Sequence, residues 1–350
     1  MKIYTCISSL FMGMMMICSV PVLAQTNISR QTEIFSIKGK DTLKIDAYIN
    51  EKAEVKPEGR PVILYIHGGG FVGGSRINAA QEIYCRYMAE RGWLALSVDY
   101  RLAGVRQNPD GSINNPYKVD GTLPAIRMAC EDVVDATNFI LTKKEWKVDA
   151  TKVVLGGGSA GAFTTLQLIY DACNDEDYTK KLPKDFSYAG GISQAGAIGC
   201  SLSQDTLVWK KKPCPLMLFH GDKDPIVPLE KSPKEQTTQL NCNFMGTIYV
   251  AHQLNQLGVP CWKWIEKGAD HVMAMKPLTN YLEEQYRFLD DFIIKKIQSE
   301  INTEVEDATP AGMASVDAML KYVPFYILGY NKYLDQMDWN KMKKPKSIVY

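Results

Sequence analysis

The sequence has no excess of charge of either sign: Lys and Arg number 40, Asp and Glu 39, and only four His occur among 350 residues. No long basic run occurs either, so the chain lacks the positive surface that neutralises a phosphate backbone, and nucleic acid is not expected as a partner. The cysteines form no CxxC pair, so neither a zinc site nor another metal site is indicated. Internal repeats and low-complexity segments are also missing.

The composition is that of a folded globular protein, with 46% apolar and 23% charged residues. After removal of a leader, about 325 residues remain, which suits one large α/β domain with insertions. We place this domain at 25–300. The mature chain would keep an odd number of cysteines, so at least one thiol is expected to be free. No disulfide is assigned among them. These cysteines are Cys85, Cys130, Cys173, Cys200, Cys214, Cys242 and Cys261.

The first segment, 1–24, has the three parts of a secretory signal. Lys2 precedes an apolar run over 7–20, and the segment ends on the small residue Ala24. We predict cleavage near Ala24 and export to the periplasm or beyond. A membrane anchor is the alternative, but the run is short for a bilayer span; a lipid anchor at Cys18 is a second alternative. No later stretch is apolar enough to span, so no stable membrane span is expected after cleavage.

The pattern of apolar residues predicts a mixed, mainly parallel α/β sheet with helices on both faces. An alternating hairpin over 33–38 and 43–49 comes first. Short, continuously apolar strands then alternate with helix-like segments. The strands are 62–66, 94–98, 153–155, 188–194, 216–219 and 261–265, and the helices are 79–91, 125–141, 160–173, 245–257 and 278–297.

Three stretches interrupt this alternation. The Asn-, Asp-, Gly- and Pro-rich loop 104–121 follows the carboxyl end of a strand, where α/β sheets bind ligands. Segments 174–185 and 201–212 are candidates for a lid or rim. A C-terminal extension over 301–350 carries aromatic residues near helical spacing, and we predict a helix packed on the body, with a partner-binding arm as the alternative.

A G-x-S-x-G sequence at 157–161 directly follows the strand 153–155 and opens a helix. A tight strand-to-helix turn would strain the backbone at Ser159 and expose its hydroxyl at the top of the sheet. Ser159 is therefore the candidate nucleophile, although a glycine-rich packing turn has the same sequence.

A second glycine-rich motif, His-Gly-Gly-Gly-Phe at 67–71, follows the strand that ends at Ile66. Its amides can approach a carbonyl oxygen closely and hold the negative charge that develops there. We expect this oxyanion hole to use the amides of Gly69, Gly70 and Ala160. His67 is interpreted as an orienting hydrogen-bond residue under the loop.

A base and an acid follow in the order that such sheet enzymes use, serine, acid, histidine. His271 follows the last strand and is the candidate base. Asp224 is the candidate acid, because Pro225 biases it toward an extended conformation; Asp222 is the alternative. Of the other histidines, His220 is interpreted as structural and His252 as a surface or packing residue on a helix.

From about residue 34 to 297, the chain resembles an α/β-hydrolase of the HGGG-bearing esterase and lipase group that includes hormone-sensitive lipase. The resemblance rests on the two glycine motifs, on Asp-Tyr-Arg-Leu-Ala at 99–103 and on His-Gly-Asp-Lys-Asp-Pro at 220–225. The chain departs from the group at two positions, where Gly158 replaces the usual Asp and Gly104 the usual Pro.

These features together predict an exported serine esterase that works through an acyl-enzyme and needs no cofactor. A serine peptidase and a non-catalytic binding protein on the same fold are the alternatives. Polar residues of the long loop, Asn108, Asn114, Asn115 and Tyr117, suggest an acylated carbohydrate as one substrate, besides other small-molecule esters. The oligomeric state does not follow from the sequence.

Overall fold

The computed structural model describes residues 27–309, apart from 105 and 108–111. The predicted signal segment 1–24, and the predicted extension from residue 310 onward, lie outside these residues. None of the described helices is long and apolar enough to cross a membrane.

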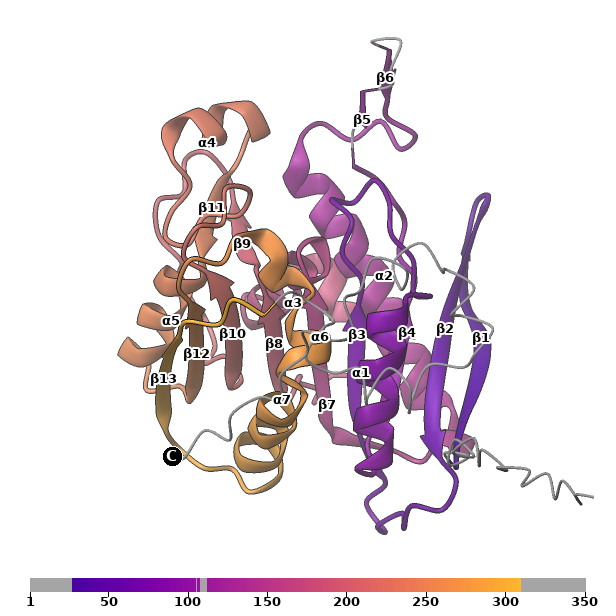
Figure 1. Ribbon diagram of the computed structural model, residues 1–350. Coiled ribbons are helices and arrows are strands. Elements are labelled where there is room, and N and C mark those ends of the chain that lie inside the picture. Colours follow the sequence, from indigo (N-terminus) through magenta and orange to yellow (C-terminus); the bar gives the residue numbers. More distant parts are fainter. Residues whose placement is uncertain (1–26, 105, 108–111, 310–350) are drawn as a thin grey trace, which may run out of the picture.

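A nine-stranded sheet forms the centre of the described chain (Figure 1). The first hairpin is antiparallel, and its inner strand pairs antiparallel with β4; every other pair in this sheet is parallel. The predicted mixed, mainly parallel sheet is therefore confirmed. In spatial order the strands are β1 (Ile28–Lys38), β2 (Asp41–Asn50), β4 (Leu94–Val98), β3 (Arg60–Ile66), β7 (Val148–Gly158), β8 (Gly190–Gln194), β10 (Leu216–Gly221), β12 (Cys261–Glu266) and β13 (Glu300–Val305).

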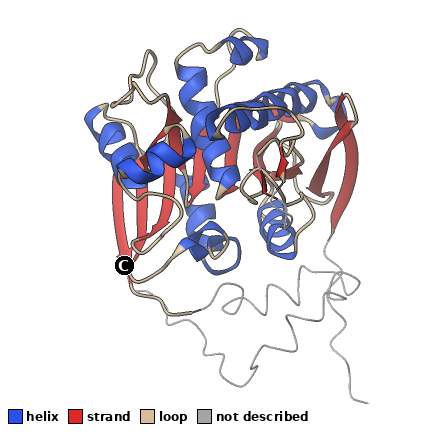
Figure 2. Cartoon of the chain, turned by 90° about the horizontal axis from the view of Figure 1, so that it is seen from above, coloured by secondary structure: helices blue, strands red, loops and turns tan. Residues whose placement is uncertain are grey.

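Helices cover both faces of the sheet, as Figure 2 shows from above. Alternate residues of β3 belong to two separate cores: Leu64 faces a core built with α2, α3 and α5, and Tyr65 faces a core built with α1 and α7. Strands that are buried on both faces in this way are expected to be continuously apolar. The helices are α1 (Ala79–Glu90), α2 (Thr122–Thr142), α3 (Ala160–Cys173), α4 (Lys234–Leu240), α5 (Thr247–Gln256), α6 (Pro277–Asn280) and α7 (Leu282–Phe288).

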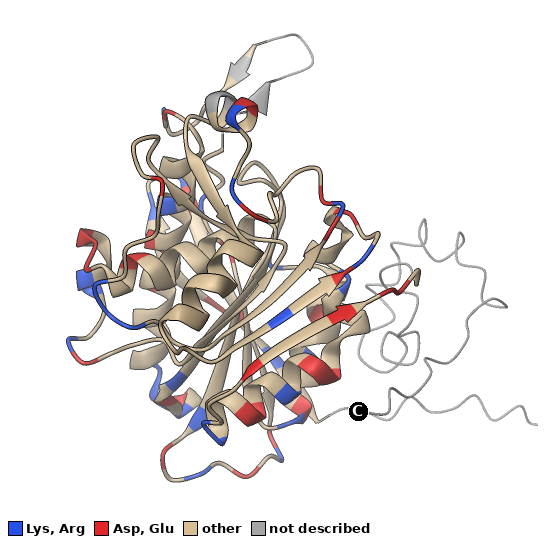
Figure 3. Ribbon diagram, turned by 90° about the vertical axis from the view of Figure 1, so that its left-hand side faces the viewer, with Lys and Arg blue, Asp and Glu red and all other residues tan. Residues whose placement is uncertain are grey.

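Shorter elements fill the connections. The strands β9 (Ala197–Cys200) and β11 (Asn243–Gly246) pair with each other, and β5 (Arg106–Gln107) pairs with β6 (Ile113–Asn114). The 3-10 helices are η1 (Lys144–Trp146), η2 (Asp177–Lys181) and η3 (His271–Ala274), and η4 (Leu289–Ile294) is a π-helix. On the side drawn in Figure 3, basic and acidic residues are intermixed along the helices and loops.

The structure corrects three details of the predicted elements. The helix predicted over 245–257 begins at Thr247, because the preceding residues pair with β9. The helix predicted over 278–297 is divided into α6, α7 and η4. Residues 301–305, expected to begin a helical extension, belong to β13, whose alternating exposure is the period of a strand packed on one side. A boundary at residue 300 therefore falls inside a strand.

Candidate active site

Four loops meet at one edge of the sheet. The glycine motif follows β3, Ser159 follows β7, Asp224 follows β10 and His271 follows β12. Because these strands are parallel, their carboxyl ends lie at the same edge, and residues that are far apart in the sequence come together there.

Ser159 occupies a strained turn between β7 and α3. Its backbone has φ 51° and ψ −120°, a conformation that costs energy for a residue with a side chain. The Ser159 amide donates to the Gln194 carbonyl (2.9 Å), and the Ser159 carbonyl accepts from the Phe163 amide (2.9 Å), so both neighbouring elements hold the turn. Ser159 is half-buried at this turn.

A chain of two hydrogen bonds links Ser159, His271 and Asp224. His271 Nε2 lies 2.8 Å from Ser159 Oγ, and His271 Nδ1 lies 2.7 Å from Asp224 Oδ2. The ionised carboxylate can only accept, so Nδ1 carries the hydrogen and Nε2 is free to accept the serine proton. The structure thus brings together the three residues that the sequence selected as nucleophile, base and acid.

Asp224 is held as a carboxylate by several donors. Burial raises the pKa of the Asp224 carboxyl, but hydrogen bonds from His220, His271 and the amides of Val227 and Ile226 outweigh burial, so the pKa falls far below its usual range. The two amides donate to Oδ1, at 3.0 Å and 2.8 Å. Oδ2 is thereby left to orient the imidazole.

The other carboxylate of this loop, Asp222, points elsewhere. Its Oδ1 accepts the Gly268 amide at 2.6 Å and so joins the acid loop to the loop of His271. This partner belongs to a distant segment and not to the turn of Asp222 itself. Within the described residues, it makes no hydrogen bond to His271.

His220, interpreted as structural, also contacts the acid. It is fully buried, with Nε2 3.1 Å from the Val227 carbonyl and Nδ1 2.8 Å from Thr247 Oγ1. Nε2 is also 3.4 Å from Asp224 Oδ2. Sequence reasoning missed this contact, although His220 lies at the end of β10, four residues before Asp224.

Of the three residues chosen for an oxyanion hole, Gly70 and Ala160 line the same cavity as Ser159, whereas Gly69 does not line it. Among the described residues, no turn or loop hydrogen bond uses the amide of Gly69 or Gly70. Ala160 is the first residue of α3, where a helix offers its amide no acceptor. The Gly69 carbonyl accepts the Val72 and Gly73 amides, which fixes the loop.

His67 supports this loop from below. Its ring stacks on Tyr100 with centroids 4.3 Å apart, and burial lowers its pKa. The Tyr100 hydroxyl donates to the His67 carbonyl at 2.9 Å. His67 therefore lies where an orienting residue was expected.

The two departures from the esterase motifs have physical reasons. The Gly104 amide donates to the Phe71 carbonyl at 2.8 Å, a bond that proline cannot make, and this bond joins the long loop to the glycine motif at 67–71. A Cβ at Gly158 would lie 2.0 Å from the Ala274 carbonyl oxygen. The helix η3, which begins with His271, thus occupies the space that an Asp side chain would need.

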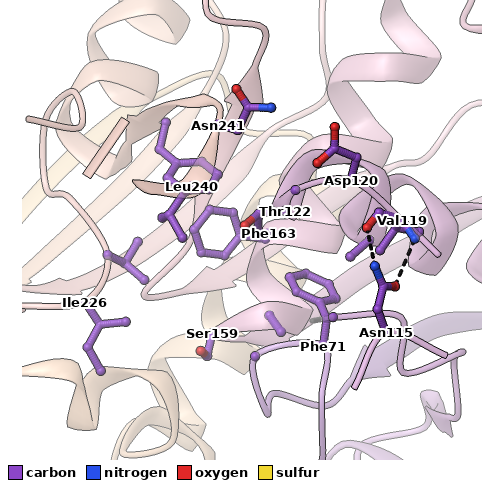
Figure 4. Close-up of a pocket in the computed structure, with 17 residues that line it drawn as sticks. Phe71, Asn115, Val119, Asp120, Thr122, Ser159, Phe163, Ile226, Leu240 and Asn241 are labelled. Carbon is purple, nitrogen blue, oxygen red and sulfur yellow. Dashed lines mark hydrogen bonds between the residues drawn. The ribbon is translucent and has the colours of Figure 1, made fainter. Parts of the chain in front are cut away.

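A cavity of about 650 Å³ opens beside Ser159 (Figure 4). Its lining includes Gly70 and Ala160, and its walls are mainly apolar: Phe71, Val119, Ala125, Phe163, Ile226, Val227, Leu240 and Phe244. Sequence reasoning did not assign these residues to a cavity, although Phe71 ends the glycine motif at 67–71. Phe163 could have been found, since it lies one helical turn after Ser159 on α3. Phe244 and Leu240 come from a distant segment and carried no local signal.

The polar loop residues are placed differently from the expectation. Asn115 lines the cavity, but its side chain is bonded to the backbone of Val119 (Figure 4). Asn115 Nδ2 donates to the Val119 carbonyl at 2.7 Å, and Asn115 Oδ1 accepts from the Val119 amide at 3.0 Å. Tyr117 lines another hollow, where its hydroxyl donates to Asp41. Asn108 lies outside the described residues, and Asn114 does not line the cavity. Among the residues described, no group of His, Cys, Asp and Glu could hold a metal ion.

Comparisons with known proteins agree with this fold. Residues 45–187 match the family model described as BD-FAE. The gut esterase 1 of Caenorhabditis elegans is 27% identical over 148 residues, which is 42% of this chain and 24% of that protein. The non-reducing polyketide synthase ascC of Acremonium egyptiacum is 32% identical over 116 residues, 33% of this chain and 5% of that protein. The chain thus spans only a small part of these curated relatives.

Among solved structures, the propionate-bound esterase 2 of Thermogutta terrifontis aligns with a TM-score of 0.52. The alignment covers 76% of this chain and 94% of that chain at 20% identity, and the apo form of the same enzyme gives 0.51. This likeness shows the arrangement of the sheet and helices. The chain thus has the α/β-hydrolase fold of these esterases, and part of its sequence is similar to known esterases.

Proposed function

We propose that the protein is a serine hydrolase of carboxylic esters. The observation that carries this proposal is the hydrogen-bonded chain from Ser159 through His271 to Asp224, together with the three amides chosen for an oxyanion hole. The fold and the likeness to esterases support the reaction class.

The geometry suits a two-step acyl transfer. His271 Nε2 takes the proton of Ser159 as Oγ attacks the ester carbonyl, and the electron pair moves onto the carbonyl oxygen, which the amides of Gly69, Gly70 and Ala160 stabilise. The imidazolium, stabilised by Asp224, returns the proton to the alcohol as the C–O bond breaks. Water then repeats the sequence on the acyl-enzyme and releases the acid.

The finer substrate proposal concerns the alcohol. The proposal of an acylated carbohydrate as substrate was based on the polar loop and on the predicted export. Because Asn115 is engaged by Val119 and Tyr117 lies in another hollow, that support now rests on the predicted export alone. Acetylated and feruloylated sugars belong in the first substrate panel, beside simple alkyl esters.

Export is proposed from the signal-like segment 1–24. Expression of the full chain in a bacterial host, followed by N-terminal sequencing of the periplasmic protein, tests it. A mature N-terminus just after Ala24 supports export, and an intact N-terminus retained in the cytoplasm contradicts it.

The hydrolase proposal is tested with p-nitrophenyl acetate and a fluorophosphonate. We expect turnover, and a mass increase at Ser159 that abolishes it. Ser159→Ala should lose several orders of magnitude in turnover, roughly a millionfold, and should not be labelled. Labelled protein that cleaves peptide substrates and no ester would favour the peptidase, and a folded protein without labelling or turnover would contradict catalysis.

A further inference from the structure

The cavity extends from one side of the triad. Ser159, Ala160 and Gly70 line it, whereas His271 and Asp224 do not. Figure 4 shows Ser159 at one end, Phe71 and Phe163 along the way, and Asp120 and Asn241 at the opposite end. The cavity therefore begins at the nucleophile and the oxyanion amides, and not at the imidazole.

The position of the imidazole decides which half of an ester enters. His271 Nε2 must deliver a proton to the alcohol oxygen as the C–O bond breaks, so the alcohol leaves on the side of His271. The acyl carbon is bonded to Ser159, and its oxygen points to the amides of the oxyanion hole. The acyl chain takes the remaining direction, which leads into the cavity.

The walls next to Ser159 suit an apolar acyl group. Phe71, Phe163 and Phe244 are each at least nine-tenths buried and present their rings there. The volume lies in the range of sites that enclose small ligands. An acetyl group would leave most of it empty, whereas longer acyl chains would bury additional methylene groups against these rings.

The far end of the cavity has a different chemistry. Thr122, Asn241 and Asp120 lie there, and Asp120 is the one charged residue in the lining. Its exposed carboxylate has no hydrogen-bond or ion-pair partner in the described part of the chain. An acyl group long enough to reach this end would meet an uncompensated negative charge.

We propose that this cavity is the acyl pocket, and that Asp120 makes it select neutral or cationic acyl ends over anionic ones. The proposal rests on the esterase function proposed above. In this proposal, the acyl part of the ester is its long, apolar part. The cavity does not select the alcohol part.

The first test compares two ester series. One keeps p-nitrophenol as the alcohol and lengthens the acyl group from acetyl to hexanoyl; the other keeps acetate and lengthens the alcohol. We expect kcat/KM to rise with acyl length, by up to roughly fourfold for each methylene buried, and to change little with alcohol length. Leu240→Trp, which fills the pocket, should reverse the acyl trend. Leu257→Trp, an exposed leucine outside the lining, is the matched control.

The second test isolates the charge of Asp120. Three p-nitrophenyl esters share one chain length and end in trimethylammonium, tert-butyl or carboxylate groups. We expect the cationic ester to exceed its neutral isostere, and the neutral ester to exceed the anionic one, each about threefold in kcat/KM. Asp120→Asn or about 0.5 M salt should remove this order. Asp185→Asn removes an exposed carboxylate outside the cavity and should leave the order unchanged.

The outcomes separate this proposal from the esterase function. Ester turnover that follows alcohol length, or a Leu240→Trp effect confined to the alcohol series, overturns the acyl pocket while leaving the esterase in place. A charge order that survives Asp120→Asn overturns the role of Asp120. Folded protein that hydrolyses no ester of either series overturns the esterase function and the pocket with it.

Discussion

Two groups of polar side chains lie at the carboxyl end of β12 and differ in how their charges are matched. The Lys276 cluster consists of Lys276, Glu266, Tyr281 and Asp307. Lys276 Nζ is 2.6 Å from Glu266 Oε1 and 2.9 Å from the Asp307 carbonyl, and the Tyr281 hydroxyl donates to Glu266 Oε2 at 2.7 Å. The side chains of Lys276 and Glu266 are only 1% and 2% exposed.

The second group is the Ser159–His271–Asp224 chain, which includes the first residue of η3. The Asp224 side chain is as buried as those of Lys276 and Glu266, but the His271 side chain is 19% exposed. The chain ends at a serine hydroxyl beside an open cavity. In the cluster, both carboxylates pair with the Lys276 ammonium group, which suits a structural role. In the proposed triad, the Ser159 hydroxyl contacts His271 on one side and the open cavity on the other, which suits proton transfer to and from a substrate.

Asp224→Asn should break the triad most severely. The amide presents the wrong hydrogen-bond partner to His271 Nδ1, and we expect a loss of about 10⁴-fold in kcat. Steady-state kinetics on p-nitrophenyl esters measure it, with thermal unfolding as the control for folding. Activity within tenfold of the wild type would remove Asp224 from the role of acid.

The same variant has a pH signature. The pKa of Asp224 is lower in the folded protein than in the unfolded chain, so its carboxylate stabilises the fold above pH of about 4 and this contribution is lost as pH falls toward the folded pKa. The wild type should therefore lose more stability than Asp224→Asn between pH 7 and pH 3. Parallel pH profiles of denaturant unfolding would contradict the lowered pKa.

Lys276→Met should break the cluster and leave the triad. Removal of the buried ammonium strands the Glu266 carboxylate, and we expect a loss of about 3–5 kcal/mol in the free energy of unfolding. Lys267→Met breaks an exposed 2.8 Å pair with Glu304 and should cost at most about 1 kcal/mol. Denaturant titration compares them. Turnover per folded molecule should stay within severalfold; a loss comparable to that of Asp224→Asn would place the cluster in catalysis.

Gly158→Ala should disturb the triad through η3. The added Cβ would press on the Ala274 carbonyl and move His271 relative to Ser159, and a shift near 1 Å costs about a hundredfold in kcat. Gly73→Ala adds a Cβ to the loop after β3 where there is room, with the nearest atom, the Gly69 carbonyl oxygen, 4.0 Å away, and serves as control. Equal kinetics for both variants would mean that the contact with η3 does not position His271.

Asp222→Asn should have the smallest effect. An amide oxygen can still accept from Gly268, so we expect a loss of at most about 1 kcal/mol in stability and little change in turnover. Thermal unfolding and kinetics, measured beside Asp224→Asn, decide between the two carboxylates. A large loss of turnover with Asp222→Asn and a small one with Asp224→Asn would assign the acid to Asp222.

The accuracy of the sequence-based predictions depended on the range of the interactions involved. Buried strands such as β3 and β4 were found because their periodicity is a local property. β13 was missed, because four of its six residues are polar and the segment becomes a strand only through pairing with β12. The proposed triad residues were found from motifs that follow strands, and the structure brings them within hydrogen-bond distance.

By itself, the sequence determined the strand-to-helix turn at Ser159, the glycine loop after β3 and the class of the sheet, since short-range sterics and periodicity specify these features. The tertiary structure decided which carboxylate faces His271, why Gly158 has no side chain, and which rings enclose the cavity. These features depend on where segments that are distant in the sequence pack against one another: Asp224 and His271 are 47 residues apart, and η3 packs on the still more distant β7. No local pattern encodes the direction of a side chain across such a contact.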